Sequence, residues 1–110
     1  MSTPRRFGQV LGLRPEREVE YIRYHAAVWP EVLDLIRACH SRNYSIFLQE
    51  HRLYAYFEYT GSDYAADMAR MAADQRMQDW WAIMEPMQEP LPTRQPGEWW
   101  SRMEEVFHTD

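Results

Sequence analysis

The order of strand-like and helix-like patterns along the chain most constrains its fold. Strand-like segments show two-residue alternation or a run of β-branched and aromatic residues, and helical segments show apolar residues at helical spacing. The strand-like segments are residues 5–13, 44–49, 52–60 and 99–109, and the helical segments are residues 15–39 and 61–84. The resulting order is strand, helix, strand, strand, helix, strand.

This order predicts an α+β, ferredoxin-like βαββαβ fold, in which an antiparallel sheet has both helices on one face. Pro30 can begin a helical segment, so we expect the first helix to be interrupted at Trp29-Pro30. Ser62 is the expected N-cap of the second helix. The short connection Glu50-His51 predicts a hairpin between the middle strands.

The sheet face opposite the helices would be rich in aromatic side chains. It would carry Tyr54 and Tyr56 together with either Tyr44 and Ile46 or Ser45 and Phe47. Because such a face is poorly suited to water, we expect a second copy of the chain to cover it. The prediction is a homodimer of the dimeric α/β barrel type.

Length and composition exclude several classes of protein. The 110 residues predict one domain over residues 1–110, with residues 1–4 as a flexible N-terminus. A net charge of −5 argues against a nucleic-acid partner. No apolar run approaches the ~20 residues of a membrane span, and no apolar signal core follows the N-terminus. The single cysteine, Cys39, fits a small buried side chain in a reducing compartment. We therefore expect a cytoplasmic protein that does not bind a membrane.

Cofactor and metal motifs are absent from the sequence. It has no phosphate-binding glycine loop, which argues against a nucleotide cofactor. The four histidines do not have the spacing of a metal site. The expectation is therefore no cofactor and no metal.

Three aromatic motifs are candidates for a ligand site. Tyr21 and His25 are four residues apart, so they lie on one helix face, where a phenol and an imidazole can exchange protons with a hydroxylated ligand. Trp80-Trp81 offers indole faces that suit the C–H faces of a sugar, and Tyr44 follows Asn43 where a turn becomes a strand. The alternative for each motif is packing in the core.

Taken together, these motifs resemble the L-rhamnose mutarotase family. The segments EYIRYHAAVWPEV, RNYSIFL and QDWWAIMEPM occur in this order, and the closing EEVFH is similar to the C-terminal strand of that family. The resemblance covers residues 6 to 108. It implies a cofactor-free, dimeric ferredoxin-like enzyme that interconverts the α and β anomers of a 6-deoxy-hexopyranose, with L-rhamnose as the first expectation.

The resemblance also implies roles for five residues. His25 would be the proton donor, delivering a proton to the ring oxygen while a tyrosine or water acts at the anomeric hydroxyl. The sugar would be bound by Tyr21, Tyr44, Trp80 and Trp81. One departure is Ala26, a position that is commonly Asn or Asp in the family, which puts the preferred sugar in doubt.

Other functions remain open on the sequence alone. The chain could be an L-fucose mutarotase or a cofactor-free oxygenase or isomerase of the dimeric barrel type. It could also be a non-catalytic dimer that binds a small molecule. Fold alone does not separate these alternatives.

Overall fold

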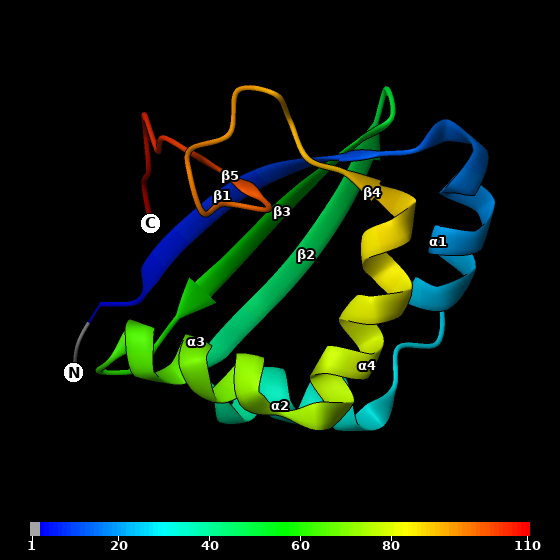
Figure 1. Cartoon of the computed structure of the whole chain (residues 1–110). Coiled ribbons are helices and arrows are strands. Elements are labelled where there is room, and N and C mark those ends of the chain that lie inside the picture. Colours follow the sequence, from blue (N-terminus) through cyan, green and yellow to red (C-terminus); the bar gives the residue numbers. More distant parts are fainter. Residues whose placement is uncertain (1–2) are drawn as a thin grey trace.

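The computed structural model describes residues 3–110, so part of the expected flexible segment 1–4 lies outside the described residues. Figure 1 shows the arrangement of the helices and strands. In chain order they are β1 (Arg5–Leu13), η1 (Pro15–Arg17), α1 (Glu18–His25), α2 (Pro30–Ala38), β2 (Ser41–Gln49), β3 (Arg52–Tyr59), α3 (Tyr64–Ala73), α4 (Gln75–Met84), η2 (Glu85–Met87), β4 (Gln88–Glu89) and β5 (Ser101–Met103). No helix among residues 3–110 is long and apolar enough to span a membrane.

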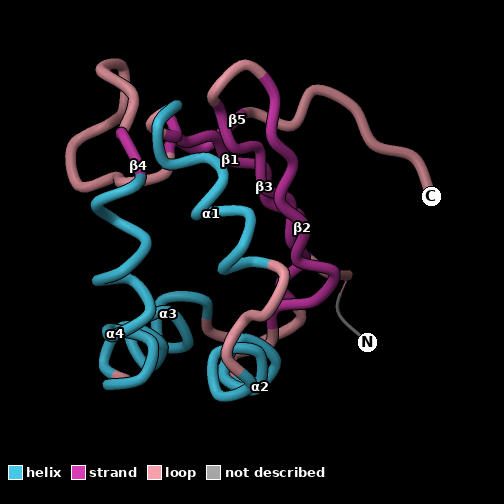
Figure 2. The backbone as a smooth tube through the Cα atoms, turned by 90° about the vertical axis from the view of Figure 1, so that its right-hand side faces the viewer, coloured by secondary structure: helices cyan, strands magenta, loops and turns pink. Residues whose placement is uncertain are grey.

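The sheet is antiparallel and has the strand order β2-β3-β1-β4, with β5 also paired to β1. The helices lie on one side of it, as Figure 2 shows. The predicted α+β, ferredoxin-like arrangement is therefore confirmed. β1 is the central support, because it pairs with β3 along almost its whole length and with β4 and β5 along its other edge.

The last strand differs from the prediction. Instead of one strand within residues 99–109, β4 pairs with Gly12 and Leu13 while β5 pairs with residues 8–10 of β1. Residues 104–110 form no regular structure. The sequence did not predict β4 because two residues are too few to show alternation, and they lie in a proline-rich connection.

The first helical region is interrupted as expected, since α1 ends at His25 and α2 begins at Pro30. The prediction of a single helix over residues 61–84 was wrong. Asp74 has extended backbone, and its side chain accepts a hydrogen bond from the Met77 amide, so it ends α3 and caps α4. Ser62 was also the wrong N-cap, because Asp63 accepts the bond from the Ala66 amide.

The β2–β3 hairpin determines which side chains face the helices. It turns at Glu50 and His51, both with positive φ, as a two-residue hairpin turn requires. A register shift between Arg42 and Ser45, with Asn43 at φ 53°, marks a bulge in β2.

The register of the β2–β3 pairing settles the two alternatives for the open sheet face. Because Ser45 pairs with Tyr56 and Phe47 with Tyr54, Ser45 and Phe47 lie on the face without helices. Tyr44 lies on the opposite face, where its ring stacks on Phe57 at 5.1 Å between centroids.

The main core lies between the sheet and the helices. Its buried members are Leu13, Tyr21, Val32, Leu53, Met77, Trp80, Met84 and Met87. Cys39 is fully buried, and burial raises the pKa of its thiol, in agreement with the predicted small buried side chain. Several core residues also line the cavity described next, so packing and site share the same elements.

Candidate functional site

A cavity of about 900 Å³ opens between the helices and the inner face of the sheet. Its volume is within the usual range for small-molecule sites. All five residues predicted for the site line it: Tyr21, His25, Tyr44, Trp80 and Trp81. They come from α1, β2 and α4, which are far apart in sequence.

His25 ends α1, and its imidazole has a defined orientation. Its Nδ1 lies 2.9 Å from the backbone oxygen of Tyr21. A carbonyl oxygen can only accept, so Nδ1 carries the hydrogen and donates it. In the neutral ring, Nε2 is then the nitrogen with the free lone pair, and it is available for proton exchange.

The environment of His25 favours the neutral ring. Burial lowers the pKa of His25 below its ordinary value of 6.5, and the hydrogen bond to the Tyr21 backbone opposes this only in part. The ring also stacks on Tyr21 with 4.1 Å between centroids. At neutral pH the imidazole is therefore mainly a proton acceptor.

The two tyrosines of the site remain un-ionised phenols. Burial raises the pKa of Tyr21 to about 12. Tyr44 is 38% exposed, and desolvation of its hydroxyl raises the pKa of this residue as well. Both hydroxyls can donate and accept hydrogen bonds, but neither is a base at neutral pH.

Both tryptophans of the pair line the cavity and pack on the core, but they differ in burial. Trp80 is 6% exposed, and it makes edge contacts with His25 and Trp29 at centroid distances of 5.6 and 5.1 Å. Trp81 is half-buried. Trp80 therefore holds the imidazole of His25 in place. Both indoles form part of the apolar wall of the cavity.

The structure adds residues that the sequence did not predict. Gln9, Gln88, Trp99 and Trp100 also line the cavity. Gln9 is the polar residue among the apolar Phe7, Leu11 and Leu13 on the inner side of β1, and this break in the pattern could have marked it as a cavity residue. No periodic pattern marks Gln88.

Asn43 and Ala26, which the sequence also singled out, differ in their position relative to the cavity. Asn43 is on the cavity lining, and its amide donates to a Glu58 carboxylate oxygen at 3.0 Å. Ala26 caps the end of α1, is exposed, and is not among the lining residues. Ala26 therefore contributes nothing to the cavity wall.

The cavity combines an imidazole, phenols, amides and indoles. Within residues 3–110, no group of three or more His, Cys, Asp or Glu side chains is arranged to hold a metal ion. The lining also includes the charged residues Arg37, Arg42 and Glu85. Aromatic faces beside hydrogen-bonding groups suit a ligand with many hydroxyls and one apolar side.

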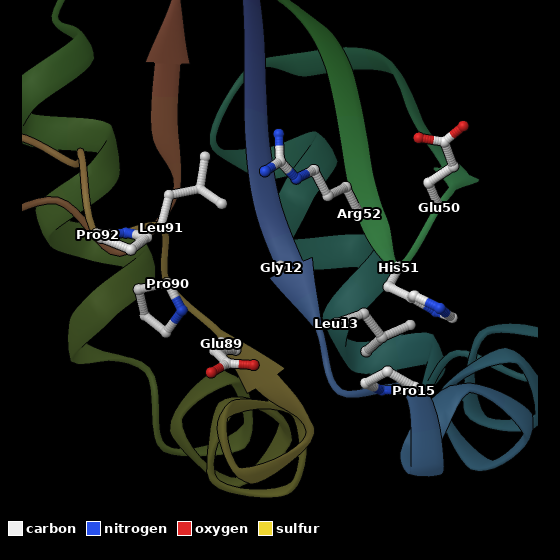
Figure 3. Close-up of a pocket in the computed structure, with 10 residues that line it drawn as sticks. All are labelled: Gly12, Leu13, Pro15, Glu50, His51, Arg52, Glu89, Pro90, Leu91 and Pro92. Carbon is white, nitrogen blue, oxygen red and sulfur yellow. The ribbon is translucent and has the colours of Figure 1, made fainter.

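A second, smaller cavity of about 300 Å³ lies near the β2–β3 turn, as Figure 3 shows. In the sheet, Gly12 pairs with Arg52 on one side and Glu89 on the other. His51 also lines this second cavity, and its Nδ1 lies 3.1 Å from a Glu18 carboxylate oxygen. None of the five predicted site residues lines it.

Comparisons with known proteins show which family the chain belongs to. The family model for L-rhamnose mutarotase matches residues 6–109. An L-rhamnose mutarotase of Oceanobacillus iheyensis is 30% identical over 108 residues, covering 96% of this chain and 99% of that protein. One from Lactiplantibacillus plantarum is 32% identical over 107 residues, with 96% and 98% covered.

A solved structure gives the same result for the fold. The crystal structure of an L-rhamnose mutarotase from Formosa agariphila superposes with a TM-score of 0.76 at 24% identity, covering 96% of this chain and 99% of that chain. At this identity the likeness shows a shared fold. From the family match and the curated relatives, this chain belongs to the L-rhamnose mutarotase family.

Proposed function

We propose that this chain interconverts the α and β anomers of L-rhamnose by opening and reclosing the pyranose ring. The observation that carries the proposal is the orientation of His25. Its Nδ1–H is held by the Tyr21 carbonyl, which leaves Nε2 free in a cavity walled by aromatic rings. The names of the relatives support L-rhamnose as the substrate.

His25 moves one proton between two oxygens of the sugar. In the opening step, Nε2 takes the proton of the anomeric hydroxyl, the C1–O1 bond becomes a carbonyl, and the bond between C1 and the ring oxygen breaks. The ring oxygen then takes the proton from the imidazolium. Both oxygens are bonded to C1, so one nitrogen can reach them in turn.

The reverse steps complete the reaction. Rotation about the C1–C2 bond turns the other face of the aldehyde towards the C5 hydroxyl, and reclosure gives the opposite anomer. His25 is thus still the proton donor to the ring oxygen, as the family resemblance implied. Its lowered pKa means that it first acquires this proton from the substrate.

The remaining site residues bind the sugar without ionising. Trp80 and Trp81 supply apolar surface for the methyl group and the C–H face of the ring. Tyr21 and Tyr44 supply hydroxyls for the polar edge, and their raised pKa values exclude a tyrosinate base at neutral pH. We assign the proton acceptor at the anomeric hydroxyl to His25, in place of the tyrosine or water expected from the sequence, because the neutral ring has a free lone pair on Nε2.

We also propose that the enzyme is a cytoplasmic homodimer. The outer face of the sheet carries Phe47, which is 64% exposed, beside the half-buried Tyr54 and Tyr56. A second copy placed face to face would remove these rings from water.

Replacement of His25 tests the catalytic proposal. His25→Ala is expected to slow enzyme-accelerated anomer exchange of L-rhamnose by about 10²-fold or more, because general acid–base catalysis supplies about 10²–10⁴-fold. Saturation-transfer NMR measures the exchange directly. His51→Ala is the matched control, since its side chain lies outside this cavity and is 58% exposed. Unchanged exchange in His25→Ala would remove His25 from the mechanism.

The same assay separates the rival functions. A panel of 6-deoxy and ordinary hexoses, including L-fucose, gives the preferred sugar from the exchange rates. Binding of L-rhamnose by the wild type without faster exchange would favour the non-catalytic binding module. Activity with none of these sugars would favour a cofactor-free oxygenase or isomerase on the same fold.

A further inference from the structure

Gln88 is a buried amide in the wall of the main cavity. It lies in β4, paired with Leu13 of β1, and is 6% exposed. Its amide joins two aromatic residues of the cavity. The Trp99 Nε1–H donates to Gln88 Oε1 at 2.8 Å, and Gln88 Nε2 donates to the Tyr21 hydroxyl oxygen at 3.4 Å.

The tryptophan determines which way the amide faces. An indole nitrogen can only donate, so its partner on Gln88 must be the carbonyl oxygen. The NH₂ group therefore points to Tyr21, and the Tyr21 oxygen is the acceptor. A flipped amide would place two donors, the indole N–H and the NH₂ group, against each other.

This orientation leaves the Tyr21 hydrogen available. The hydroxyl already accepts from Gln88, and the part of the chain that the structure describes places no acceptor for its hydrogen within bonding distance. Tyr21 lines the cavity, and its phenol is not ionised. Its hydroxyl can therefore donate to a ligand in the cavity.

The sugar offers one oxygen that can only accept. Each hydroxyl can donate and accept, whereas the ring oxygen has no hydrogen. The stacking of Tyr21 on His25, at 4.1 Å, places the phenol beside the group that acts at C1. The ring oxygen gains negative charge as its bond to C1 breaks, so a fixed donor there is strengthened in the transition state.

We infer that Gln88, held by Trp99, is a positioning residue that makes Tyr21 a hydrogen-bond donor to the ring oxygen of the sugar. The inference rests on the proposed mutarotase function. It assigns Trp99 and Gln88 a role in the reaction although neither transfers a proton to or from the sugar. The chain of bonds runs from the Trp99 indole through the Gln88 amide to Tyr21, each group donating to the next.

Gln88→Glu reverses the last bond with little change of shape. The carboxylate still accepts from Trp99, but it also accepts from Tyr21 and so turns the hydroxyl hydrogen away from the sugar. We expect kcat for L-rhamnose exchange to fall about 10²-fold, as when one transition-state donor is removed. KM should change much less, because the lost bond is strongest in the transition state.

The pH dependence distinguishes this role from a structural one. Once protonated, the carboxyl group introduced by Gln88→Glu can again donate to Tyr21. The ratio of variant to wild-type kcat should therefore rise as pH falls through the pKa of that carboxyl group. In a Tyr21→Phe background, Gln88→Glu should have no further effect on kcat, because the group through which it acts is gone.

Three results would overturn the inference. The first is a ratio of Gln88→Glu to wild-type kcat that does not change with pH. The second is an effect of Gln88→Glu on kcat that is as large in the Tyr21→Phe background as in the wild type. The third is an unchanged kcat in Gln88→Glu. A wild type that accelerates no sugar would instead overturn the proposed function together with the inference. If the carboxylate prevents folding, Trp99→Phe replaces it, since losing the indole N–H frees the amide to flip. The Trp99→Phe substitution should then lower kcat in the wild-type background but not in the Tyr21→Phe background.

Discussion

At the scale of single residues, the chemistry depends on which atom of His25 is free. The four-residue spacing of Tyr21 and His25 places both on one helix face, and the structure adds that the backbone carbonyl of Tyr21 holds Nδ1. The same carbonyl would be the α-helical partner of an amide four residues on, so the helix itself orients the ring. The active atom, Nε2, is therefore set by backbone geometry.

The pH dependence of wild-type activity follows from this arrangement. The neutral ring takes the substrate proton, and the protonated ring cannot. Since burial lowers the pKa of His25 below 6.5 in the free enzyme, kcat/KM should be constant at neutral pH and fall only as pH drops through that lowered value. NMR exchange rates at L-rhamnose concentrations below KM, followed from neutral to acidic pH, measure it. A kcat/KM that rises towards low pH would mean that the imidazolium starts the reaction.

At the scale of elements, β1 and β4 hold Gln88 in place. Gly12 of β1 lies so close to β4 that a Cβ there would be 2.3 Å from the Glu89 carbonyl oxygen. The absence of a side chain thus permits the pairing. The proline-rich connection that follows β4 brings Trp99 back to Gln88, where the two side chains form a hydrogen bond.

Gly12→Ala should therefore displace β4. We expect the free energy of unfolding to fall by about 1–3 kcal/mol, as for other overpacked sites. Activity should fall as well, because Gln88 moves with Glu89. Urea unfolding and the exchange assay measure both. Gly8→Ala is the matched control in the same strand, since its Cβ would meet only the flexible end of Met103, at 3.3 Å, and the smaller effect is expected there.

At the scale of the whole molecule, the helices cover only one face of the sheet, as Figure 2 shows. The other face holds Phe47, Tyr54 and Tyr56. We expect light scattering at micromolar concentration to give twice the mass of one chain. Phe47→Glu should give the monomer mass without unfolding the chain, because this side chain is 64% exposed in one copy. Val19→Glu, at a 71% exposed position on α1, should leave the mass unchanged. A monomeric wild type would contradict the proposed dimer.

The local patterns of the sequence predicted the parts of the fold that short-range geometry controls. Alternation predicted β1 and β3, Pro30 predicted the interruption of the first helix, and Glu50-His51 predicted the hairpin. The helix break at Asp74 escaped prediction, because apolar spacing continues across it while one side-chain cap ends the helix.

The sequence by itself determined the order of the main strands and helices, because alternation and helical spacing act over a few neighbours. Its motifs also pointed to five residues of the cavity wall: Tyr21, His25, Tyr44, Trp80 and Trp81. Only the tertiary structure decided that Gln88 joins Tyr21 to Trp99, and that the register of β2 on β3 leaves Tyr44 facing the helices. These features depend on contacts between segments far apart in the chain. Such contacts leave no periodic pattern in the sequence, so they become visible only when the sheet, the helices and the last connection are packed together.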